Sequence, residues 1–202
     1  MKLNGFALVY TGLAAIAIAA VSFMSLKNSA IAGTALVIEE IMDMRQGDMR
    51  KLNFHSQPLA TTDQIFVKAD GSDTTLANYQ GKVILLNFWA TWCAPCRHEM
   101  PMLSELQSML GGDNFEVVTL ATGRNMLPAM EKFFDEIGVS NLPLHRDPKQ
   151  LVARDMAVLG LPATVLIDVD GREIARLQGD ADWSSENARA IISTIVELTA
   201  AQ

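Results

Sequence analysis

A near-continuous apolar run, Val83-Ile-Leu-Leu-Asn-Phe-Trp89, constrains the fold of this chain more than any other segment. Successive side chains of a strand point to opposite faces, so a run of apolar strand formers is typical of a strand buried on both faces. Such a strand needs a sheet with helices packed on each side. The run therefore predicts an α/β fold, and Cys93 and Cys96 follow it almost immediately.

The chain from Thr62 onward alternates between predicted strands and predicted helices. This order predicts a mixed central sheet flanked by helices, with the cysteine pair at the carboxy end of a central strand, where open α/β sheets place their sites. The other predicted strands are an edge strand at Gln64–Ala69, then Phe115–Leu120, and a hairpin of Ala163–Asp168 and Glu173–Leu177. The predicted helices run from the cysteines to Gly111-Gly112, over Leu127–Ile137, over Lys149–Ala157, and from a cap at Ser184 or Ser185 towards the C-terminus.

The amino terminus carries an uncharged apolar stretch from Phe6 to Met24. As a helix it would measure about 28 Å, close to the roughly 30 Å hydrocarbon core of a bilayer. We therefore predict that residues 1–27 form a single transmembrane anchor, with the amino terminus in the cytoplasm and the rest of the chain exported. The alternative is a cleaved signal peptide, because Ala30-Ile31-Ala32 fits the small-residue cleavage pattern. The length of the stretch and the distance to that site favour the anchor.

Residues 28–61 are predicted to be a linker, and residues 62–202 the folded domain. A short helix over Ala35–Arg50 is an open alternative for part of the linker, because its apolar and acidic residues allow an amphipathic face. The linker ends with Gln57-Pro58.

The charge of the chain argues against a nucleic-acid partner. It has 23 acidic against 16 basic residues, a formal net charge of -7, and no run of Lys or Arg. Binding to phosphates requires clustered positive charge. We therefore expect no nucleic-acid partner.

The two cysteines are three positions apart, which indicates chemistry rather than stability. A bridge across two residues closes too short a loop to restrict the unfolded chain much. A helix that begins at Cys93 would direct unpaired amide groups and the positive end of its dipole at the sulfur, which favours the reactive thiolate. Pro95 suits the first helical turn. We predict that Cys93 attacks a partner disulfide and that Cys96 resolves the mixed disulfide, with Trp92 and Pro95 in contact with the substrate.

A second element lies far along the chain, at Gly160-Leu-Pro-Ala-Thr164, directly before a predicted strand. Proline is hard to place inside a strand ladder, but a cis Leu161–Pro162 bond would end the preceding loop tightly. Opposite Cys93, this loop would present the Leu161 backbone to an extended substrate segment. Leu161 and Pro162 are therefore predicted substrate-binding residues.

Together these motifs resemble the thioredoxin superfamily. More narrowly, the segments Asn87-Phe-Trp-Ala-Thr-Trp-Cys93 and Cys96-Arg-x-Glu-Met-Pro101 resemble the membrane-anchored TlpA/ResA/CcmG group of bacteria, and Leu159-Gly-Leu-Pro-Ala-Thr164 is most similar to the TlpA branch. The resemblance implies a thioredoxin-like fold with an inserted segment, for which Ser140–Ala157 fits. It also implies a thiol–disulfide oxidoreductase with no cofactor beyond the Cys93–Cys96 pair.

For such proteins the resemblance implies a reductant of exported proteins with cysteine pairs, itself re-reduced by a membrane electron donor. The implied tasks are assembly of the copper sites of cytochrome oxidase or cytochrome c maturation. Two departures matter. Asn87 stands where thioredoxins place a buried aspartate, and Ala163-Thr164 replaces the Glu-Thr pair usual in the cytochrome c branch.

The main alternative is a copper-binding chaperone that uses Cys93 and Cys96 as ligands. Zinc normally takes four ligands, and the chain offers no second cysteine pair and three histidines. Met100, Met102 and Met109 raise the possibility of Cu(I) ligation, although core packing explains Met100 more simply. We therefore predict no resident metal. Glu99 matches a family residue, with pairing to a surface cation such as Arg97 as its alternative.

Overall fold

The computed structural model describes residues 41–200 and divides the chain into two compact units, Met1–Asp43 and Met44–Gln202. The second unit contains the cysteine pair. The predicted membrane helix, its cleavage site and the first part of the predicted linker, residues 28–40, lie outside the described residues. Within residues 41–200, no helix is long and apolar enough to span a membrane.

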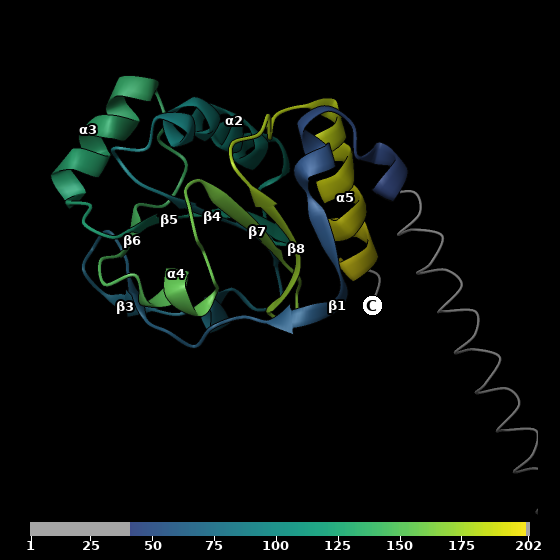
Figure 1. The fold of residues 1–202 in the computed structure, drawn as a ribbon, viewed down its shortest axis with the longest axis horizontal. Helices are drawn as coiled ribbons and strands as arrows, with labels where there is room; N and C mark the ends of the chain where they lie inside the picture. The colour runs from purple at the N-terminus through teal and green to yellow at the C-terminus, as the bar shows by residue number, and fades with distance from the viewer. Residues whose placement is uncertain (1–40, 201–202) are drawn as a thin grey trace, which may run out of the picture. The chain divides into compact units, whose positions relative to one another are not determined.

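The second unit contains an eight-stranded mixed sheet with the strand order β1-β8-β7-β4-β5-β6-β2-β3. Strand β4 is central; it runs parallel to β5 and antiparallel to β7 (Figure 1). The strands are β1 (Asn53–Ala60), β2 (Phe66–Val67), β3 (Asp73–Thr74), β4 (Val83–Trp89), β5 (Phe115–Thr122), β6 (His145–Asp147), β7 (Ala163–Ile167) and β8 (Arg172–Gln178). The helices are η1 (Gly47–Lys51), η2 (Leu76–Tyr79), α2 (Ala94–Leu110), α3 (Leu127–Ile137), α4 (Leu151–Asp155) and α5 (Glu186–Ala200).

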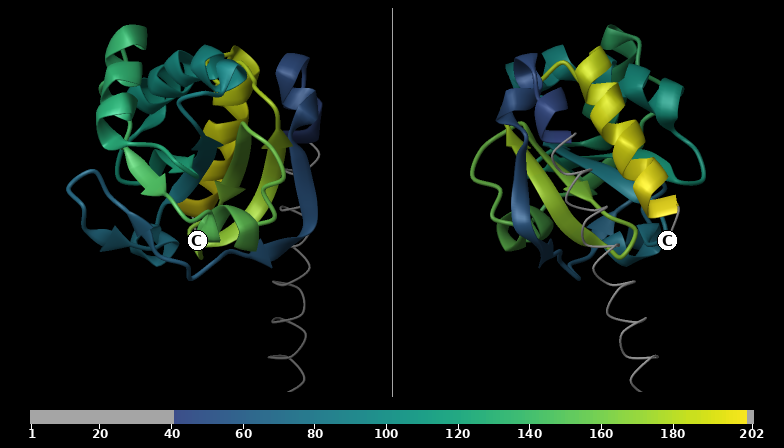
Figure 2. Two further views of the ribbon diagram at one scale, coloured as in Figure 1. Left: turned by 60° about the vertical axis from the view of Figure 1, so that its left-hand side comes forward. Right: turned by 90° about the vertical axis from the view of Figure 1, so that its right-hand side faces the viewer.

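Every residue of β4 is buried, as the apolar run predicts, because helices cover both faces of the sheet. On one face Ile84, Leu86 and Phe88 pack with Val152 of α4 and with Met156, the residue directly after this helix. On the other face α2, α3 and α5 cover the sheet, which Figures 1 and 2 show as a layer opposite α4. The predicted thioredoxin-like α/β architecture is therefore confirmed.

Several predicted elements are confirmed with small changes of length. Helix α3 spans the predicted residues and ends at Gly138, whose left-handed φ of 70° caps it. The hairpin of β7 and β8 forms around the predicted turn. The predicted strand Gln64–Ala69 shortens to β2, and β3 rather than β2 forms the edge of the sheet.

The predicted linker is wrong for its last part. Residues 53–60 form β1, which pairs antiparallel with β8 and contains a register shift between Phe54 and Leu59. Met49 and Leu52, just before β1, are fully buried. Because these residues complete an edge of the sheet and part of the core, the folded unit begins before Thr62.

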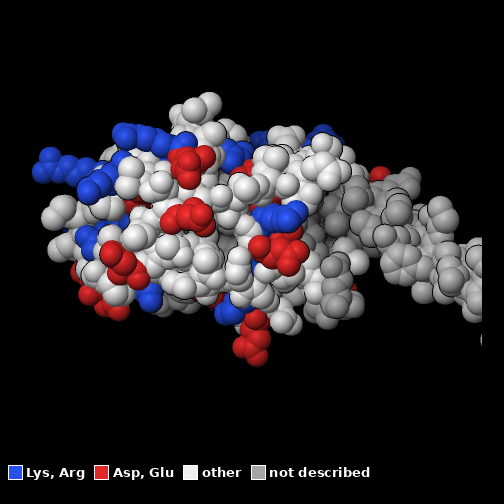
Figure 3. All heavy atoms as spheres, turned by 90° about the horizontal axis from the view of Figure 1, so that it is seen from below, with Lys and Arg blue, Asp and Glu red and all other residues white. Residues whose placement is uncertain are grey.

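The charged side chains are mixed on the described surface. In Figure 3 the acidic and basic side chains of the face seen from below are interspersed, and neither sign covers a large area of that face.

Candidate active site

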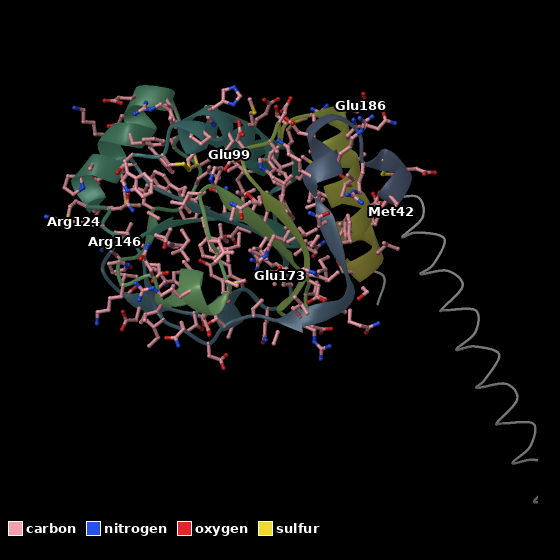
Figure 4. The ribbon with its side chains drawn as sticks, in the orientation of Figure 1. Met42, Glu99, Arg124, Arg146, Glu173 and Glu186 are labelled. Carbon is pink, nitrogen blue, oxygen red and sulfur yellow. A yellow bond between two sulfur atoms is a disulfide. The ribbon has the colours of Figure 1, made fainter. Side chains whose placement is uncertain are left out.

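Cys93 and Cys96 lie where β4 ends and α2 begins, as predicted, and they form a disulfide with a Cα–Cα distance of 5.3 Å. Figure 4 shows this bond in yellow. Cys93 is the N-cap of α2, and its Sγ accepts a hydrogen bond of 3.3 Å from the Cys96 amide. Pro95 stands in the first turn, where it costs no helical hydrogen bond. The unpaired amides of a helix start therefore point at the Cys93 sulfur.

The two cysteine residues differ slightly in their exposure to solvent. Cys93 is 5% exposed and Cys96 is completely buried. The order agrees with the prediction that Cys93 meets the partner first.

The second predicted element also has the expected backbone. The Leu161–Pro162 peptide bond is cis. The Pro162 carbonyl accepts a hydrogen bond of 2.9 Å from the Gly179 amide, which ties the loop to the end of β8. Ala163 pairs with Phe88 in the sheet, so Leu161 and Pro162 lie at the carboxy end of β4, beside the cysteine loop.

Trp92 and Leu161 line the same pocket, so the structure brings these two predicted substrate contacts together. Trp92 is 70% exposed, in agreement with its prediction as a surface residue. Trp89 is fully buried and packs against Phe133 and Phe134 of α3 with ring centroids 4.9 Å and 5.4 Å away. The two tryptophans therefore take the opposite roles that their positions predict.

Glu99 lies in the core rather than on the surface, so its predicted alternative of pairing with Arg97 is wrong. The side chain is fully buried, one turn along α2 from Cys96 (labelled in Figure 4). Its carboxylate accepts hydrogen bonds of 2.7 Å from the Asn87 amide group and 3.3 Å from the Ala181 backbone amide. Asn87 also donates to the Thr164 hydroxyl at 2.9 Å.

This arrangement gives the site a carboxylate from α2, although β4 carries Asn87 instead of aspartate. Burial raises the pKa of Glu99 to about 7, against the lowering effect of the hydrogen bonds from Asn87 and Ala181. A group with this pKa exchanges protons near neutral pH, which suits it to proton transfer. Two features of the sequence could have indicated this buried carboxylate: Asn87 within the apolar strand, and Glu99 three residues after the second cysteine.

The other side chains near the pair have structural roles. Arg97 forms an ion pair of 2.9 Å with Glu136, and its guanidinium carbon lies 4.5 Å from the centre of the Phe133 ring. It therefore connects α2 to α3. His98 is exposed, with its Nδ1 3.5 Å from an Asp180 carboxylate oxygen. Met100 is buried in the core, as predicted.

The described residues contain no cluster of side chains suited to hold a metal ion. Within residues 41–200 no group of three or more His, Cys, Asp or Glu side chains is placed to hold an ion. All three histidines and both cysteines belong to this range. The copper-chaperone alternative therefore gains no support from the arrangement of these side chains.

This chain is similar to a known protein family and to several characterised relatives. Residues 55–192 match the family model described as Redoxin. Thiol-disulfide oxidoreductase ResA of Geobacillus thermodenitrificans is 34% identical over 110 residues, which cover 54% of this chain and 62% of ResA. Thiol:disulfide interchange protein HelX of Rhodobacter capsulatus is 32% identical over 122 residues, covering 60% of this chain and 65% of HelX. The chain thus spans less than two thirds of the length of these relatives.

Solved structures show the same fold. A secreted disulfide oxidoreductase of Mycobacterium tuberculosis, homologous to E. coli DsbE, aligns with a TM-score of 0.55 and 25% identity over 64% of this chain and 94% of its own. A DsbF homologue of Corynebacterium diphtheriae aligns with a TM-score of 0.58 and 23% identity over 73% of this chain and 92% of its own. Because the Redoxin model matches residues 55–192, more than half of its length, the chain belongs to the Redoxin family, and its fold is thioredoxin-like.

Proposed function

We propose that this protein is a thiol–disulfide oxidoreductase that reduces disulfides of exported partner proteins. The observation that carries the proposal is the position of Cys93 at the start of α2, with its sulfur hydrogen-bonded to the Cys96 amide. The adjoining Leu161–Pro162 loop supplies a backbone edge for an extended segment of the partner.

The first step is attack of the Cys93 thiolate on one sulfur of the partner disulfide. The Cys93–partner S–S bond forms while the partner's own S–S bond breaks, and the leaving sulfur takes the electron pair and then a proton from solvent. The helix start stabilises the attacking thiolate before this step and no longer does so once the sulfur is bonded.

The second step releases the partner. Cys96 loses its proton, attacks the Cys93 sulfur, and forms the intramolecular disulfide, while the second partner sulfur leaves as a thiolate and is protonated. Two electrons have then passed from this protein to the partner. Glu99 lies buried one turn along α2 on the same side as Cys96, and above about pH 7 its carboxylate is available to accept the Cys96 proton.

The finer assignment follows the family resemblance. We propose that the domain faces the periplasm, that residues 1–27 hold it at the inner membrane, and that a membrane electron donor restores the dithiol. The proposed partners are proteins with cysteine pairs in cytochrome oxidase copper-site assembly or in cytochrome c maturation.

Trapping the mixed disulfide tests the function. The Cys96→Ser variant lacks the resolving thiol, so it should accumulate a covalent complex with partners in cells, seen as a band that disappears on reduction. Cys93→Ser is the matched control, because it keeps one thiol of the pair but lacks the attacking one. Equal trapping by both variants, or by neither, would contradict the assignment.

The direction of electron flow is a separate prediction. Strong oxidants of this superfamily over-stabilise the reduced form, and here Ala94 has no side-chain donor and Pro95 no amide hydrogen to do so. The reduction potential should therefore lie nearer to that of thioredoxin, about -270 mV, than to the strong oxidant near -120 mV. Equilibration with glutathione redox buffers measures it. A potential more oxidising than about -180 mV would contradict the role of a reductant.

A further inference from the structure

Gln178, the last residue of β8, places its side chain against the loop of residues 160–162, which leads into β7. Its backbone pairs with Ala163, the first residue of β7, so the side chain starts beside the end of this loop. Its Nε2 atom donates two hydrogen bonds, of 3.0 Å to the Gly160 carbonyl and of 3.1 Å to the Pro162 carbonyl. One side-chain amide thus holds the carbonyls on either side of Leu161.

The orientation of the Gln178 amide follows from the chemistry of its partners. A carbonyl oxygen only accepts, so the nitrogen of the amide must face the loop, and its two N–H groups supply one donor for each carbonyl. The Pro162 carbonyl also accepts a hydrogen bond of 2.9 Å from the Gly179 amide. The Gly160 carbonyl has no second partner in the part of the chain that the structure describes, so Gln178 alone fixes its direction.

The direction of the Gly160 carbonyl determines that of the Leu161 amide. Both belong to one planar trans peptide group, in which the C=O and N–H bonds point in opposite directions. Because Gln178 holds the carbonyl, the Leu161 N–H must point away from Gln178. Strand β8, which carries Gln178, lies on one side of β7, and β4, which leads to the cysteine loop, lies on the other (Figure 1).

The backbone of Leu161 itself is unpaired. Within residues 41–200, neither its amide nor its carbonyl has a hydrogen-bond partner. Backbone groups of this kind, at the end of a strand, are those with which an extended segment of another chain pairs. The proposed substrate edge therefore consists of free groups at Leu161, held in place by hydrogen bonds to its two neighbours.

The exposure of Gln178 supports a role in orientation rather than in solvation. Gln178 and Gly160 are both exposed, so water could satisfy the Gly160 carbonyl without the side chain. Holding a glutamine side chain in one rotamer costs conformational entropy. What the side chain supplies, and water does not, is a fixed orientation of the Gly160–Leu161 peptide group.

We propose that Gln178 is a positioning residue for the partner segment. It fixes the Gly160–Leu161 peptide group so that the Leu161 N–H can donate to a backbone carbonyl near the target cysteine. The proposal rests on the proposed function, since the partner segment must lie along Leu161 with its disulfide at Cys93. Gln178 acts through Leu161 rather than on either sulfur.

Two disulfide substrates of different size test this role. One is a peptide with a single disulfide and uncharged, extended flanks around its cysteines; the other is hydroxyethyl disulfide, which has no peptide backbone. The second-order rate constant for reduction of each by the reduced full-length protein is measured. Gln178→Met removes both donors without adding charge, and should lower the peptide rate constant about twofold to tenfold, the range for one lost hydrogen bond. Hydroxyethyl disulfide should react at the wild-type rate, because it offers Leu161 no backbone carbonyl.

Two further variants sharpen the comparison. Gln178→Glu keeps the size of the side chain but replaces the donor nitrogen with a carboxylate oxygen, which only accepts. It should lower the peptide rate constant at least as far as Gln178→Met does. Gln64→Met is the matched control, because Gln64 is also exposed and its side chain makes no hydrogen bond to the 160–162 loop. Both of its rate constants should equal those of the wild type.

The outcomes separate this proposal from the proposed function. Equal losses for the peptide and for hydroxyethyl disulfide would overturn the positioning role, because Gln178 would then support the cysteines rather than the partner segment. Peptide rate constants that stay at the wild-type value in both Gln178 variants would also overturn it. Failure of the wild-type protein to reduce the peptide would overturn the proposed function itself.

Discussion

Cys93 and Cys96 share one disulfide but have different surroundings, and their thiols should differ accordingly. Cys93 caps α2 and accepts a hydrogen bond from the Cys96 amide, whereas Cys96 is completely buried. In the Cys96→Ser variant, the alkylation rate of Cys93 plotted against pH should have its inflection below 8, compared with about 8.5 for a free thiol. The Cys93→Ser variant should react far more slowly. An inflection at or above the free-thiol value would show that the helix start does not activate Cys93.

Glu99 should make stability depend on pH in a defined direction. The pKa is raised from 4.5 to about 7, so between these values the folded protein holds a proton that the unfolded chain has lost. The free energy of unfolding should therefore fall as the pH rises through this range, by at most about 3 kcal/mol from this group. Glu99→Gln removes the ionisation and should remove this part of the slope.

Urea unfolding of the oxidised proteins at pH 5 and pH 8 measures the Glu99 contribution. Both forms keep the disulfide, so the cysteines do not titrate and the variant serves as the reference for all other groups. A difference between the two proteins that is the same at both pH values would mean that Glu99 titrates normally.

Single residues were predictable where local chemistry decides their role, and less so elsewhere. The spacing of the cysteines and the position of Trp92 directly before Cys93 were enough to place them. Glu99 was different, because its carboxylate is buried against Asn87 of strand β4 and the Ala181 amide far along the chain. From the sequence alone, a carboxylate in a helix is expected on the surface, because its distant hydrogen-bond partners are not known.

The contacts of strand β1 lead to a prediction about the stability of the fold. Glu173, a buried residue of β8, accepts hydrogen bonds of 2.7 Å from His55 of β1 and 2.8 Å from Arg176 of β8, and so connects the two strands. Although burial opposes them, these hydrogen bonds hold the pKa of Glu173 below its ordinary value. Met49 and Leu52 add two fully buried side chains just before the strand.

A chain that begins at Thr62 should therefore be less stable than one that begins at Met44. Loss of two buried apolar side chains alone predicts about 3–6 kcal/mol. Urea unfolding of the two matched chains measures the difference. Equal unfolding midpoints would show that the segment before Thr62 adds nothing to the fold.

The same strand shows why one element escaped prediction. Its sequence, Asn53-Phe-His-Ser-Gln-Pro-Leu-Ala60, contains a proline and a register shift, so it has no clean alternation of apolar and polar residues. Proline is tolerated in an edge strand, where one side of the ladder is unpaired. Strand β4, in contrast, was predicted within its observed bounds, since burial on both faces leaves an uninterrupted apolar run.

At the scale of the whole molecule, the alternation of strands and helices was sufficient to predict the architecture. The order of the strands in the sheet could not be predicted in this way, because pairings such as that of β2 with β6 join segments far apart in the chain. The inserted segment also proved to contain a sheet strand, β6, in addition to α4.

The amino terminus remains a prediction that mass spectrometry can decide. If residues 1–27 form an uncleaved anchor, the full-length protein extracted from membranes should retain its first residues. An Ala32→Lys variant, in which a charge blocks the small-residue cleavage pattern, provides the uncleaved reference mass. A mature wild-type chain beginning at Gly33 would contradict the anchor.

The contrast between the tryptophans has an optical consequence. The chain has three of them; Trp89 and Trp183 are sealed in the core, and Trp92 stands in water at the pocket. Indole emission moves to shorter wavelength when water is removed from the ring. A partner that covers the cysteines would therefore shift the fluorescence of Trp92 and leave that of the two core indoles nearly constant. The protein thus carries an intrinsic, label-free signal for docking, readable in a Cys93→Ser variant that binds without reacting.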